Sequence, residues 1–176
     1  VDSQMLAFNQ GITRRGSYAA YLNINHPEIE EFIGMRKTTG GDMNRKCLNL
    51  HNAVIITNEF LAAVTADDSW RLIDPKTNTA VKIISARDLW FQVVNTRMET
   101  GEPYIVNIDN CNDALPEEQK KLGLEIKQSN LCSEIVLPTN EERTAVCCLS
   151  SVNLEHFDKW KKKEQFIDDL ITMLDN

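Results

Sequence analysis

The sequence has no long apolar run and no excess of basic charge. No stretch approaches the roughly 18 consecutive apolar residues that a membrane-spanning helix needs, so we expect no membrane segment. The net charge of −7 argues against a surface made for nucleic acid polymers or anionic membranes. The first residues, VDSQMLAFNQ, lack the basic start and apolar core of a secretory signal. Together these absences predict a cytoplasmic protein.

Cysteine pairs of the kind that bind zinc are also missing. The chain has five cysteines, and no two of them are spaced as CxxC. Structural zinc sites commonly use such pairs, so we expect no metal site. In a reducing compartment, free thiols either pack in a core or take part in redox chemistry. The cysteines are Cys47, Cys111, Cys132, Cys147 and Cys148.

Short apolar runs alternate with helical patterns, and no repeat or low-complexity segment interrupts them. We expect buried strands at 18–24, 47–57 and 104–108, because these runs are short and apolar. Helices are expected between them, the clearest running from a capping box at Ser85 to Gly101. This alternation predicts an α/β fold with parallel strands. With 176 residues, 42% of them hydrophobic, the chain is long enough for one domain with a real core.

Shorter elements complete the expected pattern. They are a short strand at 70–73, a hairpin tip at 74–80, a polar turn at 109–112, a short helix within 116–124 and a last strand at 144–154. His51 and Asn52 lie inside the second buried strand. They could touch a ligand, although their spacing alone does not assign them one.

Both ends of the sequence interrupt a pattern. The chain does not begin with methionine, and it ends within a periodic apolar stripe that no capping glycine follows. The stripe comprises Phe166, Ile167, Leu170, Ile171 and Leu174. We therefore expect the chain to be a piece of a longer polypeptide.

The stretch SNLCSE at 129–134 combines three chemically useful side chains. In an extended backbone alternate side chains share a face, which would place Asn130, Cys132 and Glu134 on one side. At about 3.3 Å per residue each of the three would lie about 7 Å from the next along the strand. They could then hydrogen-bond a hydroxyl, abstract an atom and accept a proton. A plainer interpretation also fits: the thiol is a small core residue, Asn130 caps a turn, and Glu134 is a solvated surface group.

Several long motifs resemble one enzyme family. SNLCSEI at 129–135 is followed by AVCCLSSVNL at 145–154. The other matching segments are QGITRRGSYAAYL, HPEIEEFI, NLHNAVII and METGEPYIVNIDNCN. Together they resemble the catalytic large subunit of ribonucleotide reductase over nearly the whole chain. The resemblance implies that residues 1–176 are a partial catalytic barrel domain, part of the family's ten-stranded α/β barrel with a central finger loop. The N-terminal nucleotide-binding region and the C-terminal half of the barrel would then lie outside the chain.

The resemblance also implies roles for individual residues. Cys132 matches the radical cysteine that takes a hydrogen atom from the 3′ carbon of the ribose. Glu134 matches the general base that accepts the 3′-hydroxyl proton. Asn130 matches an amide that hydrogen-bonds the sugar, and Leu131 beside it is counted among the substrate-binding residues. Cys147 matches one of the two thiols that supply electrons and become a disulfide; its partner in the family lies before the start of this chain.

The adjacent Cys148 is a weaker candidate for the second reducing thiol. Neighbouring residues on a strand face opposite ways, and a disulfide between them would be strained. We expect Cys148 to pack on the other face. Cys47 and Cys111 have no matched role and are expected to be core or incidental thiols.

The segment QGITRRGS at 10–17 has two interpretations. From its residues it is a solvated basic turn, since glycines flank a pair of arginines. The resemblance instead implies a loop that relays the identity of a bound effector nucleotide to the substrate site. Gln10 and Arg14 match the family's contacting glutamine and arginine, and Arg15 is a neighbour that could take the role of Arg14.

The family's reaction needs a radical that this chain is not expected to generate. The resemblance implies no cofactor bound by this piece; the radical comes from a metal-containing small subunit in class I or from adenosylcobalamin in class II. The sequence as a whole favours class I, and so ribonucleoside diphosphate substrates. Other implied partners are dNTP or ATP effectors, thioredoxin or glutaredoxin as reductant, and the remaining parts of the large subunit. We expect no turnover from the isolated chain.

Other interpretations stay open at this point. The chain could be a separate product of a split gene that assembles with the other pieces. It could also be a non-catalytic α/β binding module that has kept the family core, or a thiol-based metal or redox sensor. The joint presence of Asn130, Cys132, Glu134 and Cys147 argues against a decayed module.

Overall fold

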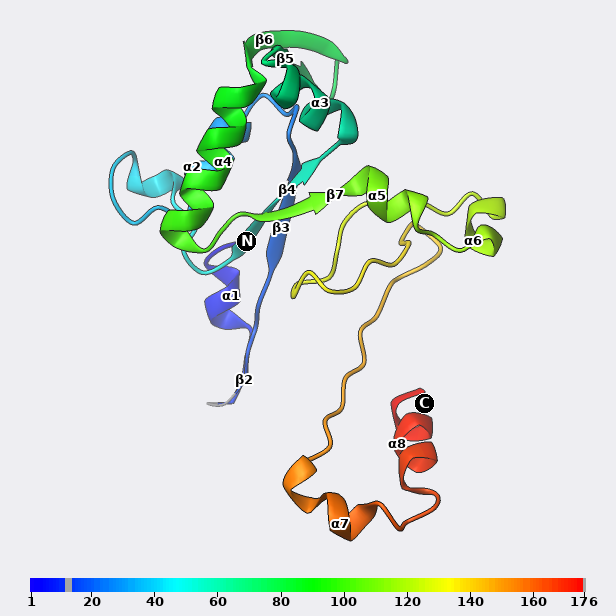
Figure 1. Ribbon diagram of the computed structural model, residues 1–176. Helices are drawn as coiled ribbons and strands as arrows, with labels where there is room; N and C mark the ends of the chain where they lie inside the picture. The colour runs from blue at the N-terminus through cyan, green and yellow to red at the C-terminus, as the bar shows by residue number, and fades with distance from the viewer. Residues whose placement is uncertain (12–13, 176) are drawn as a thin grey trace.

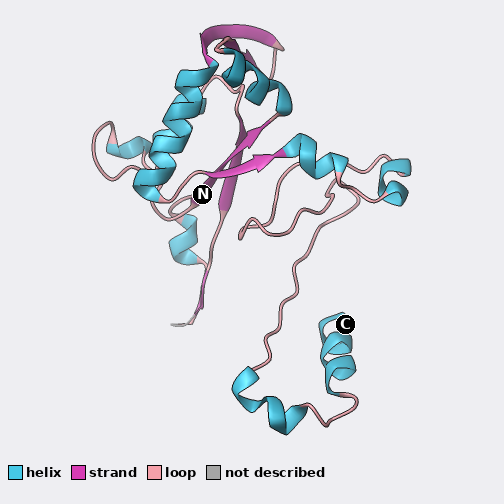
Figure 2. Cartoon of the chain, viewed as in Figure 1, coloured by secondary structure: helices cyan, strands magenta, loops and turns pink. Residues whose placement is uncertain are grey.

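The computed structural model describes residues 1–11 and 14–175. Its centre is a sheet of three parallel strands in the order β3-β4-β7, which matches the three buried strands expected (Figures 1 and 2). The strands are β3 (Ala19–Asn23), β4 (His51–Ile56) and β7 (Tyr104–Asn107). The prediction of an α/β fold with parallel strands is confirmed.

Helices and a hairpin connect these strands, because parallel neighbours need a crossover rather than a tight turn. Between β3 and β4 lie α2 (Ile29–Gly34) and the short 3₁₀ helix η1 (Met43–Arg45). Between β4 and β7 lie α3 (Asn58–Ala66), the hairpin of β5 (Ser69–Asp74) and β6 (Thr79–Ser85), and α4 (Ala86–Thr100). The helices α2 and α4 pack against each other beside the sheet (Figure 1).

One face of the sheet forms the hydrophobic core with these helices. The strand register aligns Leu22, Val54 and Ile105 across β3, β4 and β7, and all three pack in the same core cluster. Phe60 on α3 is fully buried there, with its ring edge-on to the ring of Trp70. Full burial of an aromatic side chain of this kind contributes about 3 kcal/mol relative to exposure. The core therefore holds α2, α3 and α4 against one side of the sheet.

The longest helix, α4, forms where its capping residues predict. The side chain of Ser85 accepts a hydrogen bond of 3.1 Å from the backbone N–H of Asp88. Gly101 ends the helix with a φ of 81°, a conformation that favours glycine. Leu89 and Val93 point into the core from this helix. The prediction of an ordinary core-facing helix is confirmed.

The opposite face of the sheet carries Tyr21, Ala53 and Tyr104 in one row across the three strands. Because side chains alternate along a strand, this row lies on the face turned away from the helical core. The chain returns to this face after two short helices, α5 (Ile108–Asp113) and α6 (Glu117–Lys121), as Figure 1 shows.

The returning segment is tied down by one amide. The side chain of Asn112 on α5 donates to the carbonyl of Ile126 at 3.0 Å and accepts from its N–H at 2.8 Å. Ile126 is consequently paired as if in a strand, and its side chain is buried. This contact fixes the chain a few residues before the SNLCSE stretch.

The C-terminal part of the chain contradicts one expectation. The last strand predicted at 144–154 is wrong, since residues 144–153 form no strand. A strand needs a neighbour that pairs its backbone groups, and the described residues provide none here. Val146 and Leu149 are accordingly 67% and 73% exposed. The chain ends in η2 (Leu154–His156), α7 (Phe157–Trp160) and α8 (Phe166–Asp175). None of the helices in the described part of the chain is long and apolar enough to cross a membrane.

Candidate active site

The SNLCSE stretch forms a tight turn, which we call the cysteine turn (residues 129–135). The backbone N–H of Asn130 donates to the carbonyl of Ile135 at 2.8 Å, and the N–H of Ile135 donates to the side-chain oxygen of Asn130 at 3.1 Å. The N–H of Ser133 donates to the carbonyl of Asn130 at 3.2 Å. Ser133 has a φ of 70°, in the left-handed region that suits a tight turn.

This geometry corrects the expectation of an extended strand. Asn130, Cys132 and Glu134 do not alternate along one strand face, because the chain reverses between Asn130 and Ile135. The physical reason is that a short amide side chain competes with a strand ladder by bonding nearby backbone groups. Two parts of the plainer interpretation are confirmed, the turn capped by Asn130 and the solvated Glu134, but the core thiol is wrong because Cys132 is exposed. Cys132 and Glu134 are exposed, and Leu131 is half-buried.

Two hydroxyl groups tie the cysteine turn to the sheet. The hydroxyl of Tyr21, in the middle of β3, donates to the carbonyl of Asn130 at 2.8 Å. It also lies 2.8 Å from the hydroxyl oxygen of Ser129, which is itself buried. Burial raises the pKa of Tyr21, the hydrogen bond with the Ser129 hydroxyl opposes that shift, and the charges of Tyr104 and Cys132 add to it.

A cavity of about 260 Å³ opens beside the turn. Asn130 and Ile135 line one part of its wall, and Thr144 and Cys147 line another. The structure thus brings Asn130 and Cys147 to one cavity, although 17 positions separate them in the sequence. Cys132 and Glu134 are not among the described residues that line it.

Cys148 does not lie where the sequence suggested. It was expected to pack on the face opposite Cys147, and this is wrong: both cysteines are exposed. The alternation argument fails because the segment is not part of a sheet, so neither face is covered.

The nucleotide-relay residues are only partly described. The strands β1 (Asn9–Gln10) and β2 (Arg14–Arg15) pair antiparallel, with Gln10 opposite Arg14. The side chains of Gln10 and Arg14, and residues 12–13 between them, lie outside the described part of the structure. Arg15 is exposed. The proposed roles of these residues therefore stay predictions.

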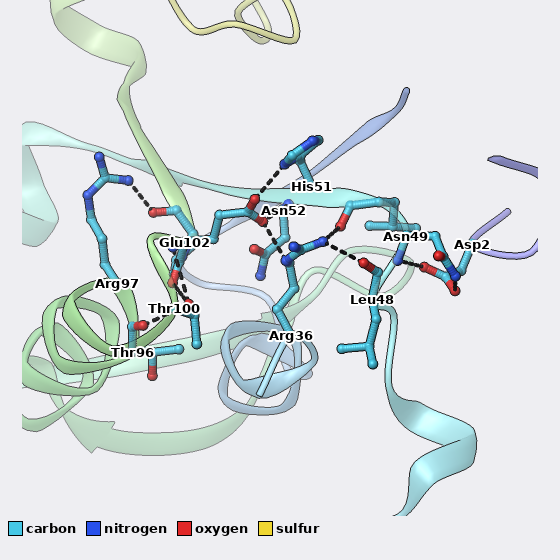
Figure 3. A network of polar contacts seen from close by, with 12 residues as sticks. Asp2, Arg36, Leu48, Asn49, His51, Asn52, Thr96, Arg97, Thr100 and Glu102 are labelled. Atoms are coloured by element: carbon cyan, nitrogen blue, oxygen red, sulfur yellow. Dashed lines mark hydrogen bonds and ion pairs between the residues drawn. The ribbon is translucent and has the colours of Figure 1, made fainter. Parts of the chain in front are cut away.

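Sequence reasoning missed a buried polar cluster that is centred on Glu102 (Figure 3). Its carboxylate lies 3.0 Å from Nε of Arg36 and 2.5 Å from Nδ1 of His51, and it accepts from the backbone N–H of Asn52 at 3.1 Å. The Arg36 guanidinium also donates to the carbonyl of Leu48 at 3.1 Å. This cluster ties the loop before β4 to the loop before β7. His51 and Asn52, which could have touched a ligand, instead serve the fold.

The only sequence signal for this cluster was indirect. A carboxylate placed directly before a buried strand needs a cationic partner if it is to be buried. Glu102 stands at such a position, but its partners lie 51 and 66 positions upstream. No local sequence pattern could have identified Arg36 and His51 as the partners of Glu102.

The thiols divide into two classes by environment. Burial raises the pKa of Cys47 and Cys111, whereas Cys132, Cys147 and Cys148 are exposed. The thiolate is the reactive form, so a raised pKa leaves less of it at pH 8. We expect iodoacetamide to alkylate the exposed cysteines several-fold faster than Cys47 and Cys111, because burial lowers the thiolate fraction of these two and hinders access of the reagent.

The check is time-resolved alkylation followed by peptide mass spectrometry. Raising the pH from 8 toward 10 should reduce the difference in alkylation rate between the two classes, because Cys47 and Cys111 then ionise as well. Labelling of Cys47 or Cys111 at the rate of Cys132 would contradict the described environments.

The parallel sheet, with helices on one face and the cysteine turn held against the other, defines the chain as an α/β protein. Comparison with known proteins gives the family. The family model described as "Ribonucleotide reductase, barrel domain" matches residues 1–176, and the chain belongs to this family.

Two similar relatives come from viruses. A putative ribonucleoside-diphosphate reductase large subunit of Frog virus 3 (isolate Goorha) is 52% identical over 176 residues, which are 100% of this chain and 31% of that protein. The ribonucleoside-diphosphate reductase large subunit of Invertebrate iridescent virus 3 is 44% identical over 229 aligned positions, covering 99% of this chain and 36% of that protein. The chain thus spans about a third of the length of these relatives.

A solved structure agrees with the relatives. The chain is similar to the Actinobacillus ureae class Id ribonucleotide reductase alpha subunit, with a TM-score of 0.62 and 32% sequence identity. The similarity covers 85% of this chain and 25% of that one.

Proposed function

We propose that this chain is the part of a ribonucleoside-diphosphate reductase large subunit that carries the radical thiol and one of the two reducing thiols. The observation that carries the proposal is the cysteine turn, which is closed by Asn130 and tied to the sheet by Tyr21. A match to the family's barrel domain over the whole chain supports the same proposal. The product would be a deoxyribonucleoside diphosphate for DNA synthesis.

The chemistry assigns a task to each of three groups. A sulfur radical at Cys132 takes the hydrogen atom from the 3′ carbon of the ribose, while Glu134 accepts the proton of the 3′ hydroxyl. The 2′ hydroxyl then leaves as water. Cys147 and a second thiol give two electrons and two protons, one proton to the departing water and one to the 2′ carbon, and become a disulfide. Cys132 then returns the hydrogen atom to the 3′ carbon, and Glu134 returns its proton to the 3′ oxygen. The exposure of Cys132 and Glu134 supports their access to a substrate.

The radical would be supplied from outside this chain. The relatives are named ribonucleoside-diphosphate reductases and the solved neighbour is described as class Id, which favours a metal-containing small subunit over adenosylcobalamin. Effector nucleotides acting through Gln10, Arg14 and Arg15, and thioredoxin or glutaredoxin as reductant, belong to the same proposal.

Asn130 would act through one half of its amide. Its oxygen accepts the N–H of Ile135, which orients the side chain and leaves the amide nitrogen as the available donor. We propose that this nitrogen donates to a hydroxyl of the substrate sugar, with Leu131 contacting the same substrate. Cys147, on the same cavity as Asn130, would stand near that sugar.

The test is a chimeric large subunit. The 176 residues replace the aligned segment of the Frog virus 3 protein, with which they are 52% identical. Assayed with a radical-generating small subunit and a dithiol, the chimera should convert ribonucleoside diphosphates to their deoxy products, and the isolated chain should not. A folded chimera without turnover, beside an active Frog virus 3 parent, would contradict the proposal.

Substitutions at Asn130 separate its two roles. Asn130→Asp keeps the oxygen that accepts from Ile135 but loses the donor, so the melting temperature should stay near that of the parent. Loss of a hydrogen bond to the reacting substrate should lower kcat/KM about 10- to 100-fold. Asn130→Ala loses both roles and should lower the melting temperature as well. Parental kcat/KM in the Asn130→Asp chimera would show that the amide nitrogen is not used.

A further inference from the structure

The cysteine turn closes on itself and is joined to the sheet at a single point. Its internal hydrogen bonds run between Asn130, Ser133 and Ile135. Among the described residues, the hydrogen bonds from the turn to the sheet both end on the hydroxyl of Tyr21, one to Ser129 and one to Asn130. Removing that hydroxyl would release the turn from the sheet, and the internal hydrogen bonds of the freed turn would open more often.

We propose that Tyr21 and Ser129 are positioning residues that fix the cysteine turn on the sheet and so place Cys132 and Asn130 for the reaction. This inference rests on the function proposed above. Tyr21 acts through the backbone of Asn130 rather than on the substrate. Because the turn is short, a shift of its backbone moves the reacting sulfur, and displacements of about 1 Å are enough to cost catalysis.

The surroundings of Tyr21 suit this role. It lies in the middle of β3, and the register places buried Ala53 beside it and Tyr104 beyond. Its raised pKa keeps the phenol protonated through the neutral range, so it remains a donor to Asn130. Ser129 is only 5% exposed, and its hydroxyl lies within hydrogen-bond reach of both the phenol and the Asn130 carbonyl. A buried hydroxyl that hydrogen-bonds both of its polar neighbours has few other partners to turn to, so the Ser129 side chain is held in one orientation.

Tyr104 offers a matched control. It belongs to the same row of the same face, and its ring stacks on His51 with 5.9 Å between centroids. No hydrogen bond joins its hydroxyl to the turn among the described residues. Tyr104→Phe and Tyr21→Phe therefore remove the same atom from equivalent strand positions, but only the second removes a tie to the turn.

The experiment uses the chimeric large subunit and two readouts. Tyr21→Phe should lower kcat about 10-fold with little change in KM, and should speed amide hydrogen exchange at Ser133 and Ile135 by about 10-fold, the effect of losing one or two hydrogen bonds. Ser129→Ala should act in the same direction and more weakly. The fold decrease in kcat of the double variant Tyr21→Phe/Ser129→Ala should be smaller than the product of the two single decreases, because both residues belong to the same hydrogen-bonded link.

The outcomes are distinguishable. Faster exchange together with lower kcat in Tyr21→Phe, and neither change in Tyr104→Phe, supports the proposal. Parental exchange in Tyr21→Phe overturns it, as does faster exchange with parental kcat, since the tie would then have no effect on the reaction. A parental chimera without turnover contradicts the proposed function instead, and the exchange data alone then decide whether Tyr21 holds the turn.

Discussion

Replacing Cys132 by serine is expected to abolish deoxynucleotide formation in the chimeric large subunit. A serine O–H bond is much stronger than a thiol S–H bond, so the hydroxyl cannot carry the radical that abstracts the 3′ hydrogen. We expect turnover to fall by on the order of 10⁴-fold or more, the scale on which loss of a reacting group acts in a covalent catalyst. Cys132 is exposed and the substitution is nearly isosteric, so the melting temperature should not change.

Cys148 provides the matched control for this result. It is also an exposed free cysteine, and it has no role in the proposed reaction. Cys148→Ser should retain turnover within about twofold, in line with a surface substitution away from the site. Turnover in Cys132→Ser at the level of Cys148→Ser would remove Cys132 from the mechanism.

Replacing Glu102 by alanine is expected to destabilise the fold more than any change at the cysteine turn. The Glu102 side chain is 8% exposed and faces Arg36 and His51, so its removal leaves a largely buried cation unpaired. Breaking a buried pair from one side costs about 3 kcal/mol or more. Glu102→Gln keeps an oxygen for the Asn52 N–H and should cost about half as much, since it loses only the charge. Urea unfolding followed by circular dichroism measures both.

Glu99 is the control for Glu102. Its carboxylate forms an ion pair of 3.0 Å with Lys37, but the pair is on the surface and the Glu99 side chain is 54% exposed. Exposed ion pairs contribute at most about 1 kcal/mol. Glu99→Ala should therefore leave the unfolding midpoint nearly unchanged. If Glu99→Ala and Glu102→Ala lowered the free energy of unfolding equally, burial would not be the reason that the Glu102 cluster stabilises the fold.

The sequence predicted those elements whose cause is local. The three strands of the sheet follow from short apolar runs, and α4 follows from Ser85 and Gly101 at its ends. The short helix α6 and the hairpin that begins at β5 were also expected. By contrast, the polar turn expected at 109–112 is the helix α5, because the side chain of Asn107 caps it by accepting from the N–H of Asn110 at 3.1 Å.

The remainder depends on contacts that no local pattern contains. Tyr21 meets Ser129 across 108 positions, so neither residue is marked as part of the site by its neighbours in the sequence. The family motif drew attention to Asn130, but an alternating pattern was the wrong geometry for it, because its amide bonds the backbone of Ile135. The strand expected at 144–154 does not form, although its residues have a high strand propensity. The described part of the chain supplies no neighbouring strand with which its backbone could pair.

The central claim is that the sulfur that starts the reaction and the sulfur that supplies electrons are different residues of this chain. The most direct test is one turnover of the chimera with substrate but without dithiol, followed by differential alkylation of free and disulfide-bonded cysteines. The account predicts that Cys147 becomes disulfide-bonded to a cysteine outside the chain, in proportion to the deoxy product formed, while Cys132 and Cys148 remain free thiols. Product formation with Cys147 still free, or with Cys132 or Cys148 in the new disulfide, would contradict it.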